Sequence, residues 1–211
     1  DAAGKKSEMA HQLAVMAKAL KRDMETALCS KVAKNAGAAA TVRQTGGFET
    51  WTETNVSRGT NGAGAGNGAA PTDGTQRAFT ETILKAVHQL CFANGGEPSM
   101  LIVGPHVKGV VSGFSGRTSV TQTVDANTVE ASVAIYAGDF GELKVVPSNF
   151  SRSRSALFVD PNFAKTCFMR DFETIDIATI GDAITKMLVV EFGLEVSNEK
   201  AHGIAADLST S

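Results

Sequence analysis

Only one pair of residues in the sequence has both the chemistry and the spacing of a metal site. His88 and Cys91 are three residues apart in a segment whose apolar spacing predicts a helix, so one ion could bridge their side chains. A structural zinc site uses four such ligands, usually in two pairs, and the sequence offers no second pair. Cys91 also falls on the apolar side of the segment, where a free cysteine usually packs as a small hydrophobic residue. We therefore predict no metal site and no cofactor.

The residues that could act as nucleophiles or as acid–base pairs form no recognisable catalytic motif. A Gly-x-Ser-x-Gly arrangement is absent, and Cys167 lies in the apolar run KTCFM, which indicates a core position. Glu49 with Glu53, and Asp171 with Glu173, have spacings that are typical of solvated faces of exposed strands. No catalytic residue is predicted, and the chain is not expected to be an enzyme.

Two stretches could contact phosphate. Arg152 and Arg154 form a small basic turn, although such a turn is more often solvated surface. The segment Thr60–Gly74 contains alternating glycines, but a phosphate loop needs a strand before the glycines and a helix directly after them. Here the residues PTDG follow, and the lysine of the triphosphate-binding version is missing. The segment is therefore predicted to be a flexible loop or linker, whose glycines are Gly62, Gly64, Gly66 and Gly68.

The composition is that of a globular protein with a buried core. Hydrophobic residues make up 43% of the sequence and charged residues 20%, and the formal net charge is −2. This charge does not imply a polyanion-binding surface over the whole molecule, but it does not exclude a local basic patch. Three cysteines, an odd number, favour free thiols in a reducing compartment. No apolar run has the length of a membrane span, and no signal peptide is visible.

The first predicted element is a long amphipathic helix from Ser7 to Lys34. Its large apolar residues recur every three or four positions, which places them on one side of a helix roughly 40 Å long. Ser7 is the expected N-cap, and the residues after Lys34 are expected to stop the helix. A coiled-coil segment is the alternative, but the apolar stripe drifts and lacks a sustained seven-residue repeat. The stripe consists of Met9, Leu13, Met16, Leu20, Met24 and Leu28.

The C-terminal part is predicted to be strand-like from Lys165 onward. Between Ile184 and Val196 the apolar residues occupy even positions and Glu191 and Glu195 odd ones, which predicts the longest strand of the chain. This strand is the natural floor for the long helix, so Phe192 is expected to be buried between the two. A turn and a final short strand are expected near the C-terminus.

Shorter elements are predicted between these two ends. Apolar runs, caps and turn residues indicate a helix–strand–helix unit, a hairpin through the link AGDFGE, and isolated short strands. The predicted helices are Glu81–Ala93, capped by Thr80, and His106–Phe114. The predicted strands are Phe48–Val56, Ser99–Val103, Val129–Ala137, Leu143–Val146 and Ala156–Asp160, and Gly116–Asn127 is expected to be an exposed loop.

Four stretches together resemble the major head proteins of tailed phages, whose fold is shared with encapsulins. They are NGGEPSMLIVGPHVKGVVSGFSG from Asn94, VAIYAGDFGELKVVPSNF from Val133, ALFVDPNFAKTCFMRDF from Ala156 and GDAITKMLVVEFGLEVSNEKAHGI from Gly181. Each motif is weak alone, but their order and spacing are specific, and the resemblance covers residues 7–208. It implies an α+β phage major-capsid fold with a long spine helix, a long-stranded peripheral domain and a compact axial domain.

On this resemblance, residues 1–78 hold the spine helix and the first part of the peripheral domain. Residues 79–160 form the axial domain, and residues 161–211 complete the peripheral domain. Relatives usually carry an N-terminal arm and an extended loop before the spine helix, whereas this sequence starts at Asp1 without a methionine. The expected alternatives are that the chain is a processed or truncated piece, or that those parts were not retained, and no crosslinking residue is carried over.

The resemblance implies a major capsid protein of a tailed bacteriophage that assembles into an icosahedral shell around double-stranded DNA. Its expected partners are other copies of itself in hexamers and pentamers, the packaged DNA without sequence-specific binding, and scaffold, portal or decoration proteins, with no membrane. The expected location is the virion capsid, after assembly in the host bacterial cytoplasm. The alternatives are an encapsulin-type compartment shell and a small-molecule-binding α/β enzyme domain.

Overall fold

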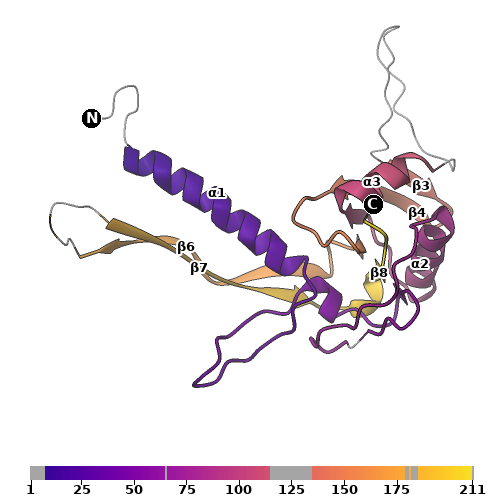
Figure 1. Ribbon diagram of the computed structural model, residues 1–211, viewed down its shortest axis with the longest axis horizontal. Coiled ribbons are helices and arrows are strands. Elements are labelled where there is room, and N and C mark those ends of the chain that lie inside the picture. Colours follow the sequence, from indigo (N-terminus) through magenta and orange to yellow (C-terminus); the bar gives the residue numbers. More distant parts are fainter. Residues whose placement is uncertain (1–7, 65, 115–134, 179–180, 182–184, 211) are drawn as a thin grey trace, which may run out of the picture.

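The computed structural model describes residues 8–64, 66–114, 135–178, 181 and 185–210. A compact body contains a six-stranded sheet, and a long helix and a two-stranded hairpin extend away from it in roughly the same direction (Figure 1). The predicted N-cap Ser7, the loop Gly116–Asn127 and the first residues of the predicted strand Val129–Ala137 lie outside the described residues. Mixed helix and sheet content agrees with the predicted α+β class.

The helices and strands follow one another in an order close to the predicted one. The α-helices are α1 (Glu8–Leu28), α2 (Glu81–Ala93) and α3 (Pro105–Ser112), and the 3-10 turns are η1 (Phe48–Thr50) and η2 (Glu199–Ala201). The strands are β1 (Val56–Ser57), β2 (Met100–Val103), β3 (Ile135–Gly138), β4 (Gly141–Pro147), β5 (Ala156–Val159), β6 (Ala164–Ile177), β7 (Thr185–Val196) and β8 (Gly203–Ala205).

The six-stranded sheet has the order β1-β8-β5-β2-β4-β3 and is covered on both faces. Alternation along the central strands sends Phe158 and Ala205 to the face that α2 and α3 cover, and Leu157 and Ile204 to the opposite face. That second face is packed by Cys29, just after α1, by Phe48 of η1 and, more loosely, by residues at the root of the β6–β7 hairpin. The sheet therefore anchors the two extended elements to the body.

Helix α1 ends at Leu28, so its predicted continuation to Lys34 is wrong. The N–H groups of Cys29 and Ser30 still donate to the last helical turn, but the backbone after them bonds to other segments: Lys34 N–H donates to the Gly68 carbonyl at 2.8 Å. Residues 35–44 then form a narrow ribbon, closed by bridges between Asn35 and Gln44 and between Ala38 and Thr41. Among the described residues, no helix is long and apolar enough to cross a membrane.

The β6–β7 hairpin confirms the period-two pattern but not the expected burial. Even positions of β7 are half-buried and most odd positions are exposed, as the alternation predicted. Phe192, expected to be buried, is only half-buried, because α1 lies close to the hairpin near its root and diverges from it toward the N-terminus (Figure 1). β6, with 14 residues, is longer than β7, with 12, so the predicted longest strand is also wrong.

The predicted strand Phe48–Val56 is replaced by the η1 turn and the two-residue strand β1. The strand-forming Thr50 and Thr52 are buried, and Thr50 Oγ1 donates to the Gly47 carbonyl at 2.7 Å within the turn. Asn55 holds the next segment in place by donating to the carbonyls of Lys200 and His202. Side-chain hydrogen bonds to distant backbone therefore override the strand propensity of this stretch.

Candidate functional site

The one pair with the spacing of a metal site, His88 and Cys91, lies inside the compact body. His88 is 2% exposed and Cys91 is fully buried, and both side chains lie on the face of α2 that packs against the rest of the body. Burial raises the pKa of the Cys91 thiol to about 12, so it is protonated and a poor ligand at neutral pH. The His88 ring instead packs edge-on against Phe140, with ring centroids 5.9 Å apart. No group of three metal-ligating side chains occurs among the described residues.

The prediction that Cys167 is a core residue is wrong. Its side chain is exposed on β6, and its Sγ donates to Glu195 Oε2 at 3.0 Å across the hairpin. The apolar run KTCFM belongs to a two-stranded hairpin, most of whose β6 residues are exposed, so this run is not deeply covered by the described part of the chain. Asp171 and Glu173 are exposed on the same strand, as their spacing predicted.

The basic turn of Arg152 and Arg154, predicted to be solvated surface, is part of a largely buried ion-pair network. Arg152 Nη1 donates to Glu49 Oε2 at 3.0 Å, and its Nη2 donates to Asp73 Oδ1 at 2.5 Å. The Arg152 side chain is 16% exposed and Glu49 is fully buried, so the predicted solvated face at Glu49 is wrong too. Arg154 Nη2 lies 3.3 Å from Asp207 Oδ1, and Asp207 is also fully buried.

Through this network the glycine-rich segment becomes an anchored loop. Asp73 accepts from Lys31 Nζ at 2.6 Å as well as from Arg152. Burial acts to raise the pKa of Asp73, but the hydrogen bonds from Lys31 and Arg152 outweigh it and hold the pKa at about 2. Asp207 accepts from the backbone N–H groups of Gly59 and Gly74. The network therefore joins the chain after α1, the loop and the C-terminal segment.

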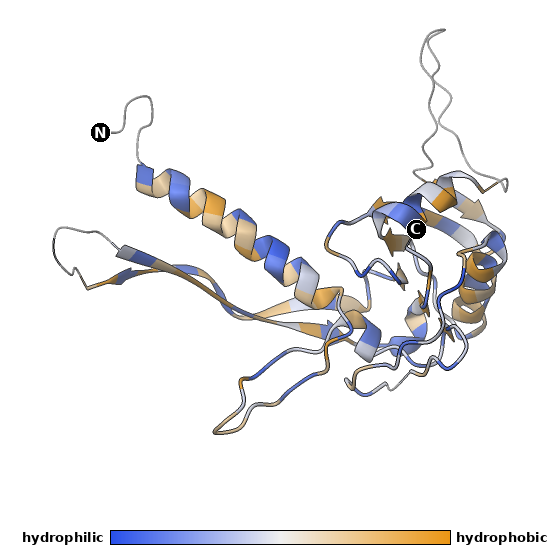
Figure 2. Cartoon of the chain, viewed as in Figure 1, coloured by the Kyte–Doolittle hydropathy of each residue, from blue (hydrophilic) through white to orange (hydrophobic). Residues whose placement is uncertain are grey.

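A second notable feature is the exposed apolar surface of the extended elements. On α1 only Met24 is buried, and Val15 and Met16 are 48% and 61% exposed. Met169 on β6 is 81% exposed, and Val42 at the ribbon is 87% exposed. Figure 2 shows hydrophobic residues interspersed with hydrophilic ones along both α1 and the hairpin, while α2 of the body is more hydrophobic. The chain by itself covers little of this surface.

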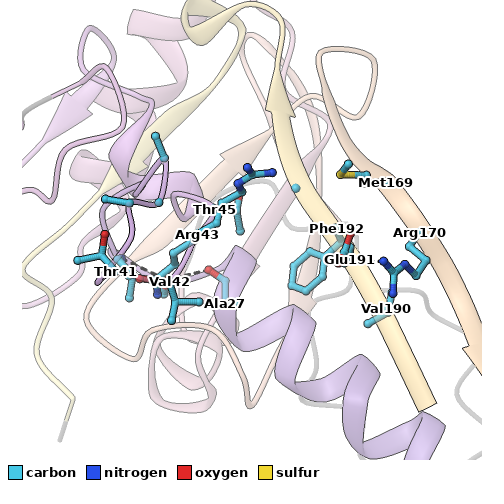
Figure 3. A pocket seen from close by; sticks show the side chains of 17 residues that line it. Ala27, Thr41, Val42, Arg43, Thr45, Met169, Arg170, Val190, Glu191 and Phe192 are labelled. Carbon is cyan, nitrogen blue, oxygen red and sulfur yellow. Dashed lines mark hydrogen bonds and ion pairs between the residues drawn. The ribbon is translucent and has the colours of Figure 1, made fainter. Parts of the chain in front are cut away.

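A groove runs between the ribbon and the β6–β7 hairpin. Figure 3 shows Thr41, Val42 and Arg43 on one side and Val190 and Phe192 on the other, with the end of α1 near its base. The groove has a volume of about 1140 Å³ and is open to solvent. Most of the residues that line it are apolar or glycine. The charged groups are Arg43, and Arg170 and Glu191, which pair with each other at 3.6 Å.

Because two histidines are buried, we expect the free energy of unfolding to decrease in weak acid. Burial lowers the pKa of His88 and, against the opposing effects of the Phe163 carbonyl, Asp160 and Glu199, that of His202. His202 is fully buried, and its Nδ1 accepts from the Asp160 N–H at 3.2 Å, which requires the neutral ring.

Because both pKa values are lower folded than unfolded, this contribution is fully present above about pH 6.5 and declines as the pH falls toward the folded pKa values. Urea unfolding should give a smaller free energy at pH 5.5 than at pH 7.5, and His88→Gln should reduce the difference. An equal free energy at the two pH values would contradict this assignment.

Comparisons with known proteins identify a family and a similar solved structure. A family described as SU10 major capsid protein matches residues 1–209. A chain from a structure of the satellite phage P4 procapsid including the size determination (Sid) protein has a similar fold, with a TM-score of 0.59 at 10% sequence identity. The alignment covers 99% of this chain and 67% of that chain. No curated protein matches.

A virus-like particle from Pyrococcus furiosus also matches in structure, with a TM-score of 0.37 and 10% identity, over 62% of this chain and 54% of that chain. This similarity is too weak to carry an argument. The family match spans nearly the whole sequence, and the P4 structure has the same fold at low identity. Both confirm the resemblance that the four sequence stretches indicated. The chain belongs to the SU10 major capsid protein family.

Proposed function

We propose that this protein is the shell-forming subunit of a tailed-phage head, and that it assembles into hexamers and pentamers of an icosahedral capsid. The observation that carries this proposal is the pair of extended elements, α1 and the β6–β7 hairpin. Their apolar side chains are mostly half-buried or exposed in the single chain, with Met16 at 61% and Met169 at 81%. A monomeric protein rarely exposes so much apolar surface on projecting elements, whereas a shell subunit buries it against neighbours.

The proposed domains correspond to distinct parts of the fold. In this proposal α1 is the spine helix, and α2, α3 and strands β2–β5 form the axial domain. The peripheral domain combines the rest of residues 1–78 with residues 161–211, and so includes the β6–β7 hairpin, β1 and β8. The sheet takes β1 from residues 1–78, β2–β5 from residues 79–160 and β8 from residues 161–211, and β8 pairs with both β1 and β5. The proposed domains are therefore interlocked by the sheet rather than joined by a single linker.

The proposed contents and partners follow from charge and family. A net charge of −2 suits a shell that encloses double-stranded DNA without sequence-specific contacts, because a strongly basic wall would bind the genome and hinder its release. Scaffold, portal or decoration proteins are proposed further partners, and assembly is proposed to take place in the host bacterial cytoplasm. A role as a structural subunit rather than an enzyme agrees with the capsid family.

Assembly of the protein tests this proposal directly. The full-length protein, expressed alone or with its scaffold, is expected to sediment as rings or closed shells, and electron microscopy should show hexameric and pentameric units. Assembly should become stronger in salts that favour apolar burial, such as sulfate, since the extended elements expose apolar side chains. A full-length protein that stays monomeric at high concentration under all these conditions would overturn the proposal.

A further inference from the structure

The groove between the ribbon and the hairpin has the properties of a docking site with one unpaired cation. Val42 and Met169 lie at its edges and are 87% and 81% exposed, and Phe192 is half-buried within it. Arg43 lines the groove, and its guanidinium has no ion-pair partner among the residues that the structure describes. An occupant of this groove should therefore be apolar and should carry a carboxylate.

The distal part of the β6–β7 hairpin presents a surface of that kind. Ile175 lies directly opposite Met187 in the pairing register, and Ile177 is two residues further along the same face. Ile177 is 42% exposed and Met187 is 44% exposed. Glu173 lies two residues before Ile175 on this face, is exposed, and has no ion-pair partner in the described part of the chain. The patch is thus apolar, with one free carboxylate at its inner border.

The groove and the distal patch cannot meet within one chain. Met169 and Ile177 are eight residues apart on one extended strand, a separation of about 26 Å at roughly 3.3 Å per residue. The bonds between β6 and β7 continue to the pair Ile177–Thr185, so the strand cannot fold back onto itself without breaking the hairpin. Only a second copy of the chain can bring the two surfaces together.

We infer that the distal end of the β6–β7 hairpin of one subunit docks in the groove of a neighbouring subunit, with Glu173 beside Arg43. The contact uses two different patches on the two copies, so it is heterologous, and repeated rotation about an axis closes it into a ring. This inference rests on the proposed function and names one of the surfaces through which the subunits associate.

Disulfide trapping between two proteins that each carry one exposed engineered cysteine, beside the buried Cys29 and Cys91, tests the contact. In a Cys167→Ser background, which removes the one exposed thiol among the described residues, Val42→Cys and Ile177→Cys proteins are mixed, assembled and mildly oxidised. A crosslinked dimer is expected from the mixture and not from either protein alone. In the control mixture, Leu90→Cys on α2 replaces Ile177→Cys as the partner of Val42→Cys. The two positions are matched in exposure, since Leu90 is 41% exposed and Ile177 is 42% exposed.

Charge reversal provides an independent readout. Arg43→Glu faces the Glu173 carboxylate of the neighbour with a like charge, and is expected to raise the protein concentration needed for assembly by roughly five- to tenfold. Glu173→Arg alone should act similarly, and the double variant Arg43→Glu/Glu173→Arg should restore assembly. Both residues are exposed, so thermal unfolding of the unassembled variants should match that of the parent.

The outcomes separate this inference from the proposed function. If the parent assembles but Val42→Cys does not crosslink to Ile177→Cys, or Leu90→Cys crosslinks equally well, the contact is wrong while the shell function stands. Assembly that is unchanged in Arg43→Glu, or not restored in the double variant, also overturns the contact. A parent that fails to assemble overturns the proposed function itself, and the contact with it.

Discussion

Replacing Arg152 with methionine is expected to lower the free energy of unfolding by about 3–5 kcal/mol. Arg152 provides the hydrogen bond to the fully buried Glu49 carboxylate, at 3.0 Å, and a second one to Asp73 at 2.5 Å. Without the guanidinium, the buried Glu49 carboxylate loses its hydrogen bond at Oε2, and no described group donates one to its other oxygen, Oε1. Arg58 interacts with Glu49 only through space, which favours the lower end of the range. Urea denaturation at pH 7 measures the loss.

Two further variants show whether burial is the cause. Arg170→Met removes an ion pair of 3.6 Å to Glu191 in which both side chains are 47% exposed, so it should cost less than about 1 kcal/mol. Glu49→Gln introduced into the Arg152→Met protein removes the unpaired charge and should recover part of the stability. Equal losses for Arg152→Met and Arg170→Met would show that the network does not act as a buried one.

A methyl group added at Gly203 is expected to destabilise the protein by about 1–3 kcal/mol, and a valine there by more. Gly203 is the buried first residue of β8, where α2 packs against the sheet. A Cβ at this position would lie 2.7 Å from both Cys91 Sγ and Val87 Cγ1, well inside van der Waals contact. Helix α2 would have to move off the sheet, and the cluster that holds the body together would open. Thermal unfolding of Gly203→Ala and Gly203→Val measures the cost.

Gly109 is the matched position for this test. It lies in α3, and among the described residues no atom outside the neighbouring helix backbone lies within 4 Å of an added Cβ. Gly109→Ala should therefore raise stability by up to about 1 kcal/mol through helix propensity. Cys91→Ala should partly relieve Gly203→Ala, because it removes one of the two clashing atoms. If Gly203→Ala is as harmless as Gly109→Ala, the close packing of α2 on β8 is incorrect.

Local signals in the sequence were sufficient for the elements of the compact body. Thr80 caps α2 by accepting from the Ile83 N–H, and the helix spans Glu81–Ala93 as its apolar stripe and its cap predicted. The unbroken apolar run before Gly104 forms β2, and Pro105 opens α3. The link AGDFGE forms the turn between β3 and β4, with Gly141 at a φ of 130°. In these cases the deciding interactions lie within a few residues of one another.

The extended elements show that sequence patterns predict which residues share a face but not how deeply that face is buried. Period-two alternation correctly predicted which residues of β7 share a face, but alternation does not say how much of that face is covered. Phe192 is therefore half-buried, and Cys167 in an apolar run is exposed, because the hairpin has only two strands and α1 diverges from it. The helical pattern likewise gave the side of α1 that carries its apolar stripe, but not that only Met24 would be buried.

The family could be inferred from the order of four sequence stretches, and the family match over residues 1–209 confirms it. The ion-pair network could not be inferred, because its partners are far apart in the chain: Arg152 is 103 residues from Glu49 and 79 from Asp73. A lone Arg, Glu or Asp has the same local sequence signature whether it is solvated or buried. Only the tertiary fold, by bringing opposite charges together away from water, decided that these residues hold the loop, the chain after α1 and the body in one unit.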